Sequence, residues 1–193
     1  MLDADPSFRP VRRRDGYLPL EDMGLIGDGT TSALVGLDGS IPWLCLPRFD
    51  SEPLFCGLLD AARGGSFTVA PDEVIEARQR YEHDTAVLVT ELQGPTGLLA
   101  VTDALALRPG ADLSDDAPDG RRELIRSAVA LDGSVRVREA LRCVHELHAE
   151  LGEERFRSLE VFDNDEDVVH PFERHCPSIR GVLALVFARA RSG

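Results

Sequence analysis

The chain has 193 residues, of which 43% are hydrophobic, so it is long enough for a domain with a buried core and too apolar for a disordered chain. Its net charge of -13 argues against nucleic acid and anionic membrane surfaces as partners, because both attract basic patches. The sequence shows neither a secretory signal nor an apolar run of membrane-spanning length, so we expect a cytoplasmic location by default.

Residues 1–16 are polar and contain two prolines and a run of three arginines, which predicts a flexible leader. From Met23 onward, short apolar runs alternate with glycine turns. The runs at 23–27, 31–37 and 41–46 read as short antiparallel strands, and Asp38-Gly39 suits a tight hairpin turn between the last two.

The segment after Ser51 has a different spacing of apolar residues. Leu54, Phe55, Leu58 and Leu59 recur at helical intervals, with Ser51 as a plausible N-cap. This pattern predicts one short helix near 52–62.

Longer strands are predicted for the middle of the chain, at 66–70, 74–81, 85–93 and 98–107. An acidic loop follows at 109–120, and two further strands, 123–131 and 134–141, are expected to form a hairpin around Asp132-Gly133. Residues 17–142 therefore read as a mainly β, incomplete antiparallel β-sandwich.

The stretch from Asp38 to Ser51 contains the only tryptophan, Trp43, in an apolar segment, followed by Arg48 and Asp50 behind a proline. This order suggests a buried strand that ends in charged groups at the rim of the fold. Binding residues are common at the rims where strands end. From the chemistry alone we favour a structural interpretation, in which Trp43 belongs to the core and Arg48 and Asp50 form an ion pair.

The same stretch carries a resemblance. The segment YLPLEDMGLIGDGTTSALVGLDGSIPWLCLPRFDSEPLFCGLLD, which begins at Tyr17, resembles the start of the bacterial glucoamylase and trehalase-like proteins of glycoside hydrolase family 15. Many anchors match in one order, among them Ile26-Gly27-Asp28, Asp38 through Ile41 and Trp43 through Ser51. The chain departs at Pro42, where the family usually has Asp before the Trp. Proline removes a backbone donor, so the local strand pairing there is in question.

The resemblance implies an N-terminal β-sandwich followed by a helical (α/α)6 barrel. Inverting hydrolysis uses two carboxyl groups roughly 6.5–9.5 Å apart, and the resemblance implies that both are glutamates of the barrel. The barrel is absent from these residues. We therefore assign no catalytic residue, no metal and no cofactor, and expect the chain to be inactive alone.

The resemblance also implies a role for the rim. In the intact architecture a sandwich loop can reach the mouth of the active site, with Arg48 and Asp50 binding sugar hydroxyls and Trp43 offering an aromatic face. Trp43, Arg48 and Asp50 are thus candidates for a substrate rim, ranked below the structural interpretation.

Residues 143–193 do not resemble the family, and the spacing of Val144, Leu147, Leu151 and Phe156 predicts a helical or irregular tail. His145 and His148 could share a helix face, but they lack a HExxH pattern, and no metal site is predicted. The tail is either a divergent segment or the product of a frameshift in a truncated gene, and we favour the frameshift. That interpretation predicts that another reading frame after the codon for Arg142 restores family-like sequence.

The four cysteines, Cys45, Cys56, Cys143 and Cys176, have no CxxC spacing, and Cys45 and Cys56 are expected to be buried thiols. The resulting hypothesis is a non-catalytic N-terminal domain of a glucoamylase- or trehalase-like hydrolase, which meets an α-glucan or trehalose-type sugar only through the barrel. The alternative is a stand-alone carbohydrate-binding or scaffold module.

Overall fold

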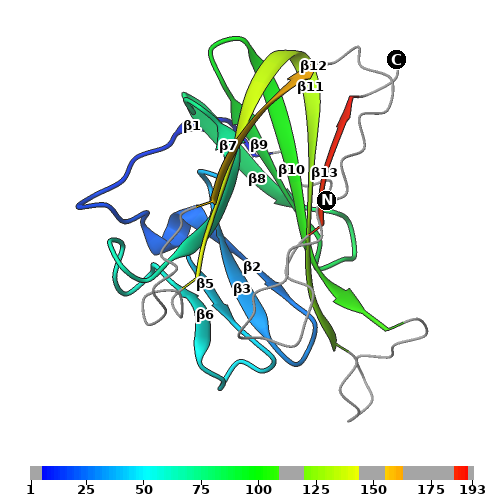
Figure 1. Cartoon of the computed structure of the whole chain (residues 1–193). Helices are drawn as coiled ribbons and strands as arrows, with labels where there is room; N and C mark the ends of the chain where they lie inside the picture. The colour runs from blue at the N-terminus through cyan, green and yellow to red at the C-terminus, as the bar shows by residue number, and fades with distance from the viewer. Residues whose placement is uncertain (1–5, 109–119, 144–154, 163–184, 191–193) are drawn as a thin grey trace.

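Two β-sheets pack face to face in the computed structural model (Figure 1). The structure describes residues 6–108 and 120–143 and, for the backbone alone, 155–162 and 185–190. Among these residues the only helix is a 3-10 turn, η1 (Leu20–Asp22). The mainly antiparallel β-sandwich predicted from the sequence is confirmed.

The smaller sheet has four antiparallel strands in the order β2-β3-β5-β6. Their bounds are β2 (Met23–Gly27), β3 (Ser32–Gly36), β5 (Trp43–Cys45) and β6 (Pro53–Cys56).

The larger sheet has the order β1-β8-β9-β10-β11-β7-β4, and β12 and β13 add to β11. The bounds are β1 (Arg9–Pro10), β4 (Ser40–Ile41), β7 (Ser66–Pro71), β8 (Glu76–Tyr81), β9 (Leu88–Gln93), β10 (Gly97–Leu107), β11 (Gly120–Arg142), β12 (Arg155–Phe162) and β13 (Leu185–Ala190). Strand β1 pairs with β8 and thereby ties part of the predicted leader to the sheet.

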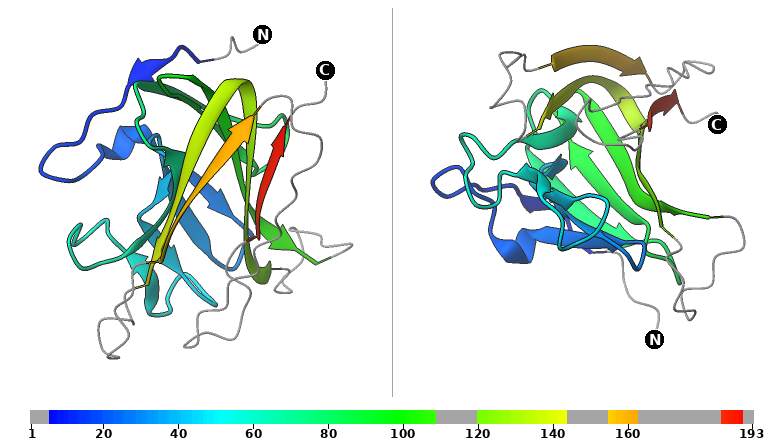
Figure 2. Two further views of the ribbon diagram at one scale, coloured as in Figure 1. Left: turned by 45° about the horizontal axis from the view of Figure 1, so that its top comes forward. Right: turned by 60° about the horizontal axis from the view of Figure 1, so that its bottom comes forward.

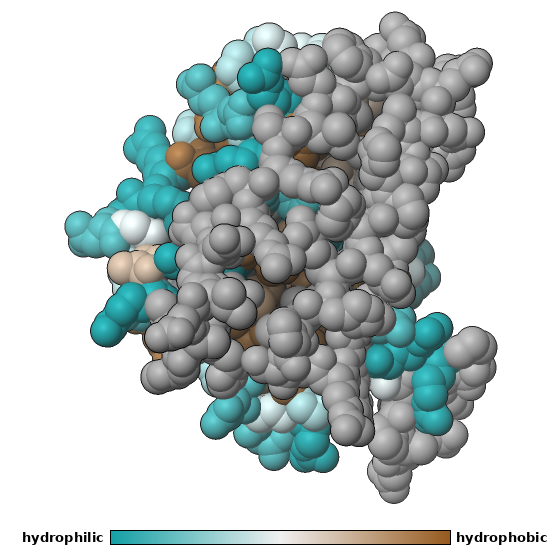
Figure 3. All heavy atoms as spheres, viewed as in Figure 1, coloured by the Kyte–Doolittle hydropathy of each residue, from teal (hydrophilic) through white to brown (hydrophobic). Residues whose placement is uncertain are grey.

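The core lies between the two sheets and follows the two-residue period of the strands. Leu99, Val101 and Leu105 of β10 alternate with less buried neighbours, as an inward-facing row should. From the smaller sheet, Val35 and Leu44 are also fully buried. Burial of each such leucine or valine side chain contributes about 1.5–3 kcal/mol relative to exposure. In the space-filling view the coloured residues along the edges of the visible face are mostly hydrophilic (Figure 3).

Pro42 marks the point where the chain passes from one sheet to the other. Ile41 of β4 pairs with Phe67 in the larger sheet, whereas Trp43 of β5 pairs with Leu34 in the smaller sheet. A residue between two ladders has no partner strand for its N–H, so a proline fits there. The predicted turn at Gly39 is present, with a φ of 77°, but the segment after it is split between the two sheets.

The predicted hairpin around Asp132-Gly133 is wrong. Strand β11 runs unbroken from Gly120 to Arg142 and pairs with β10 before Gly133 and with β7 after it. Gly133 has a φ of 65° and lies beside a register shift opposite Leu98 and Leu99. Such a residue bends a strand without reversing it, because both halves have long partners elsewhere.

The predicted helix near 52–62 is also wrong, because Pro53–Cys56 is strand β6. Phe55 pairs with Leu44 of β5, and this tertiary pairing overrides the helical spacing of the apolar residues. The chain then turns back, and the Cys56 N–H donates to the carbonyl of Gly64 at 2.7 Å. The Asp60 carboxylate organises the turn by accepting the N–H groups of Ala62 and Arg63, each at 3.0 Å.

The helical prediction for the tail fails where the structure describes it. Strand β12 pairs antiparallel with Ser134–Leu141, and β13 pairs parallel with Ile125–Ala130. Both strands therefore extend the larger sheet along β11, as the two further views show (Figure 2). His145 and His148 lie outside the described residues.

Candidate functional site

The loop after β5 holds two of the three predicted rim residues together. Arg48 Nε donates to Asp50 Oδ1 at 2.9 Å, and the two side chains are 60% and 57% exposed. The Arg48 N–H donates to Ser51 Oγ at 3.2 Å, and the Ser51 N–H donates to the Arg48 carbonyl at 3.0 Å. The loop is therefore closed on itself and presents a paired cation and anion to solvent.

The hydrogen bond between Arg48 and Asp50 changes the acidity of both groups. It lowers the pKa of the Asp50 carboxyl below its ordinary value and raises the pKa of the Arg48 guanidinium. Both groups are thus charged at neutral pH, so Arg48 could donate hydrogen bonds to a polar ligand and Asp50 could accept them.

Trp43, the third predicted rim residue, is placed in strand β5 rather than in the loop. It is half-buried between Leu34 of β3 and Cys56 of β6. The structure thus brings Arg48 and Asp50 together and leaves Trp43 in the sheet. Its role at a substrate rim stays a prediction.

An aromatic residue that the sequence reasoning missed lies between the two charges. Phe49 is 67% exposed, and its N–H donates to the carbonyl of Thr30 at 3.2 Å. Its position between two charged residues of a loop was the available signal for its exposure, and Leu59 and Leu20 are exposed to a similar extent.

A second Arg–Asp pair lies in the centre of the sandwich. Arg126 of β11 and Asp103 of β10 are both fully buried, and Arg126 Nε donates to Asp103 Oδ1 at 2.6 Å. The remaining guanidinium nitrogens donate to Asp103 Oδ2 at 3.2 Å, to the Phe67 carbonyl at 2.7 Å and to the Gly39 carbonyl at 2.8 Å. One side chain thereby joins β10, β11, β7 and the turn before β4.

Burial and pairing act in opposite directions on Asp103. Burial raises the pKa of its carboxyl group, whereas the charge and hydrogen bonds of Arg126 oppose that rise. The guanidinium carbon of Arg126 also lies 4.8 Å from the centre of the Phe67 ring, a cation–π distance. The cluster is fully engaged within the protein, and we assign it a structural role.

The register of β10 and β11 could have revealed this pair. Asp103 lies between Val101 and Leu105 in an inward-facing row, and Arg126 follows Leu124 in another. Opposite charges at inward positions of adjacent strands are typical of a buried ion pair.

Asp28, within the turn from β2 to β3, is another buried acid. Its Oδ1 accepts the N–H groups of Thr30 at 2.9 Å and Thr31 at 2.8 Å. Its Oδ2 has no hydrogen-bond partner among the described residues and lies against Gly120, where an added Cβ would be 2.0 Å away. The close approach explains why glycine occupies position 120.

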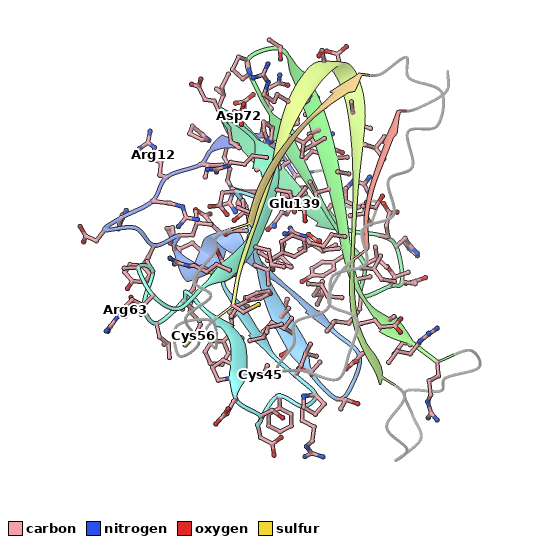
Figure 4. All side chains as sticks on the ribbon, viewed as in Figure 1. Arg12, Cys45, Cys56, Arg63, Asp72 and Glu139 are labelled. Atoms are coloured by element: carbon pink, nitrogen blue, oxygen red, sulfur yellow. The ribbon has the colours of Figure 1, made fainter. Side chains whose placement is uncertain are left out.

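Two described cysteines lie on neighbouring strands of the smaller sheet (Figure 4). Cys45 is buried and Cys56 half-buried, and both are free thiols, so burial of Cys45 is confirmed. Burial, with a smaller contribution from Cys56, raises the pKa of the Cys45 thiol, which disfavours the reactive thiolate.

The described residues contain no group of three or more His, Cys, Asp or Glu side chains arranged to hold a metal ion. Most of the acidic loop at 109–120 lies outside the described part of the chain. No helix among the residues that could be searched is long and apolar enough to cross a membrane.

Comparison with known proteins assigns the chain to a family. The model of the family "Trehalase-like, N-terminal" matches residues 14–145. The chain is 36% identical to a trehalase of Mycolicibacterium smegmatis over 110 residues, which are 56% of this chain and 16% of the relative. It is 39% identical to a trehalase of Thermoplasma volcanium over 79 residues, which are 40% of this chain and 13% of the relative. No solved structure matches significantly.

A third relative covers more of the chain. A trehalase of Mycobacterium tuberculosis is 28% identical over 194 aligned positions, which cover 93% of this chain and 28% of the relative. That coverage extends past Arg142 into the segment for which the sequence alone offered no resemblance, and the frameshift interpretation stays a prediction. The chain spans less than a third of the length of each of these three trehalases. The family model matches more than half of the chain, and the chain therefore belongs to the trehalase-like N-terminal domain family.

Proposed function

We propose that this chain is the non-catalytic N-terminal domain of a trehalase- or glucoamylase-like hydrolase of the glycoside hydrolase family 15 type, in the cytoplasm of a bacterium. One observation carries the proposal. The family match covers residues 14–145, and the trehalases that align with this chain have more than two thirds of their length outside the alignment. That further length is where we place the helical catalytic barrel and the contacts with a trehalose-type sugar or an α-glucan.

The chemistry of the described acids supports a non-catalytic role. An inverting hydrolase needs one carboxyl group that can give a proton and another that can activate water. Asp103 is held by Arg126, Asp28 uses one oxygen to order its own turn, and Glu91 pairs with Arg78 at 2.7 Å. Each of these three buried acids is bound by partners within the sandwich.

A chimera tests the proposal. The segment of the M. smegmatis trehalase that aligns with this chain is replaced by the corresponding part of this chain, and trehalose hydrolysis is assayed. We expect the 193-residue chain alone to be inactive and the chimera to hydrolyse trehalose. Hydrolysis by the chain alone, or an inactive chimera that also fails to assemble, would contradict the proposal.

A stand-alone carbohydrate-binding module is the second candidate, favoured by the exposed Phe49 between Arg48 and Asp50. Small-molecule sites typically combine aromatic side chains with a few polar groups that orient the ligand. Calorimetric titration of the chain with trehalose and with maltooligosaccharides distinguishes the candidates. Saturable binding by the chain alone would favour the module, and its absence favours the domain of a longer enzyme.

A further inference from the structure

Strand β2 forms one edge of the smaller sheet, because β3 is its only hydrogen-bonded neighbour among the described strands. Antiparallel pairing uses the backbone groups of every second residue. The Leu37 N–H donates to the Asp22 carbonyl at 2.8 Å, which sets the alternation at the start of this ladder. Leu25, three residues after Asp22, therefore directs its N–H and C=O away from β3, at the middle of the edge.

The sequence of β2 does not protect this edge. It reads MGLIG, without a charge or a proline, and its ladder with β3 has no register shift. Charged side chains, prolines and bulges are the usual features that keep an edge strand from pairing with another chain. Leu25 is also 54% exposed, so an apolar side chain lies in solvent at the middle of the edge.

A tyrosine of the larger sheet occupies the edge instead. The Leu25 N–H donates to the Tyr81 hydroxyl oxygen at 2.9 Å, and the same hydroxyl donates to the Leu25 carbonyl at 2.8 Å. A hydroxyl can form both bonds because it is a donor and an acceptor. One side chain thereby takes the two backbone bonds that a residue of an added strand would form with Leu25.

Packing between the two sheets positions this hydroxyl. Tyr81 is the last residue of β8 and pairs with Leu88 of β9. Leu88 lies against Gly24, where an added Cβ would be 2.5 Å from a methyl carbon of Leu88. The absence of a side chain at Gly24 lets β9 approach β2 closely, so the neighbouring Tyr81 reaches Leu25.

We propose that Tyr81 blocks the edge of β2 against strand addition, and that the strand it excludes is β2 of a second copy of this chain. Two identical antiparallel strands can pair about a twofold axis, because each presents the same surface to the other. With the axis at Leu25, the N–H and C=O of each Leu25 would bond to Leu25 of the other copy. No charges would oppose each other within the paired strands, since β2 contains none.

Tyr81→Phe in the 193-residue chain tests the proposal, because it removes the hydroxyl and keeps the ring. The matched control is Tyr17→Phe. The Tyr17 hydroxyl also accepts a backbone N–H, that of Ala61 at 3.2 Å, and donates to a backbone carbonyl, that of Leu59 at 3.4 Å. These two residues belong to a turn and not to an edge strand. Sedimentation velocity over a range of chain concentrations measures self-association, and circular dichroism melts verify that each variant folds.

We expect Tyr81→Phe to lower the dissociation constant of the dimer roughly tenfold or more, since pairing no longer has to displace two hydrogen bonds. Tyr17→Phe should sediment like the unmodified chain. Addition of Leu25→Lys to Tyr81→Phe should restore the sedimentation of the unmodified chain, because two lysines directly opposite each other repel.

A folded Tyr81→Phe chain that sediments like the unmodified chain would overturn the proposal. Equal association of the two tyrosine variants would also overturn it, as would association that Leu25→Lys does not suppress, because the contact would then lie elsewhere. Amide hydrogen exchange of the unmodified chain keeps the proposal testable if Tyr81→Phe fails to fold. Protection of the Leu25 amide would support the block, and rapid exchange of that amide would contradict it.

Discussion

Two Arg–Asp pairs in this domain have similar hydrogen-bond lengths and opposite surroundings. Arg126 and Asp103 are 0% exposed and joined at 2.6 Å, whereas Arg48 and Asp50 are 60% and 57% exposed and joined at 2.9 Å. The buried guanidinium also reaches the second carboxylate oxygen of Asp103 and two backbone carbonyls on other segments, whereas the exposed pair lies within one loop of four residues.

The difference shows what burial demands of a charge. An arginine removed from water must have its donors satisfied by the protein. Arg126 therefore donates hydrogen bonds to β10, to β7 and to the turn before β4. An exposed arginine keeps water as a partner and is free to meet a ligand or a docking surface. An Arg–Asp pair therefore stabilises the fold at the buried site, whereas the pair at the exposed site is available for contacts.

The largest expected effect is that of Arg126→Met, which breaks the buried pair. Removal of one partner from a buried ion pair typically costs about 3–5 kcal/mol, and here the carbonyls of Phe67 and Gly39 also lose a donor. Urea unfolding of the variant measures the change in the free energy of unfolding. A loss below about 1 kcal/mol, the scale of an exposed pair, would show that the cluster is not central to stability.

Gly39→Ala should have the next largest effect, because Gly39 supports the same cluster from the backbone. Its φ is 77°, and an added Cβ would lie 2.3 Å from the Val69 carbonyl oxygen. Backbone strain alone costs about 1–3 kcal/mol, and the clash adds to it. The matched control is Gly27→Ala, whose added Cβ would meet no described atom closer than 3.4 Å. Equal unfolding midpoints for the two variants would contradict this explanation.

Arg48→Ala should leave the unfolding midpoint within experimental error of the unmodified chain. Its partner Asp50 is exposed, and water replaces the lost hydrogen bond. Thermal unfolding followed by circular dichroism is sufficient to test this. A decrease like that of Arg126→Met would mean that the loop is part of the stabilising framework.

The smallest expected effect is on acidity. The hydrogen bond from Arg48 depresses the pKa of Asp50, so any stability that the pair contributes is present at neutral pH and lost as the pH falls through the folded-state pKa. Carboxyl NMR titration should find Asp50 below the ordinary value of an aspartate, and Arg48→Ala should raise it. An unchanged pKa in that variant would assign the depression to another cause.

The sequence was sufficient for the parts of the fold that depend on local pattern. The alternation along 98–107 and the apolar run at 66–70 predicted β10 and β7 with nearly correct bounds. Asp103 and Arg126 occur among inward-facing apolar residues. This placement also indicates a buried ion pair, although no such pair was predicted from the sequence.

The remaining features depend on long-range pairing, which local pattern does not encode. Phe55 has helical spacing with Leu58 and Leu59, but its pairing with Leu44 makes it part of a strand. Asp132-Gly133 has the sequence of a hairpin turn, yet β10 and β7 hold the two halves of β11 in one strand. The backbone of Phe49 likewise forms a hydrogen bond with Thr30, 19 residues earlier in the chain, which local pattern does not reveal.

The most direct test of the contrast is a pair of double-mutant cycles, one on Arg126 and Asp103 and one on Arg48 and Asp50, each read by urea unfolding of the 193-residue chain. The structure predicts a large coupling energy for the buried pair, where each single variant leaves a buried charge unpaired, and a coupling energy of at most about 1 kcal/mol for the exposed pair. Equal coupling energies in the two cycles would contradict the claim that the buried pair stabilises the fold and the exposed pair contributes little to stability.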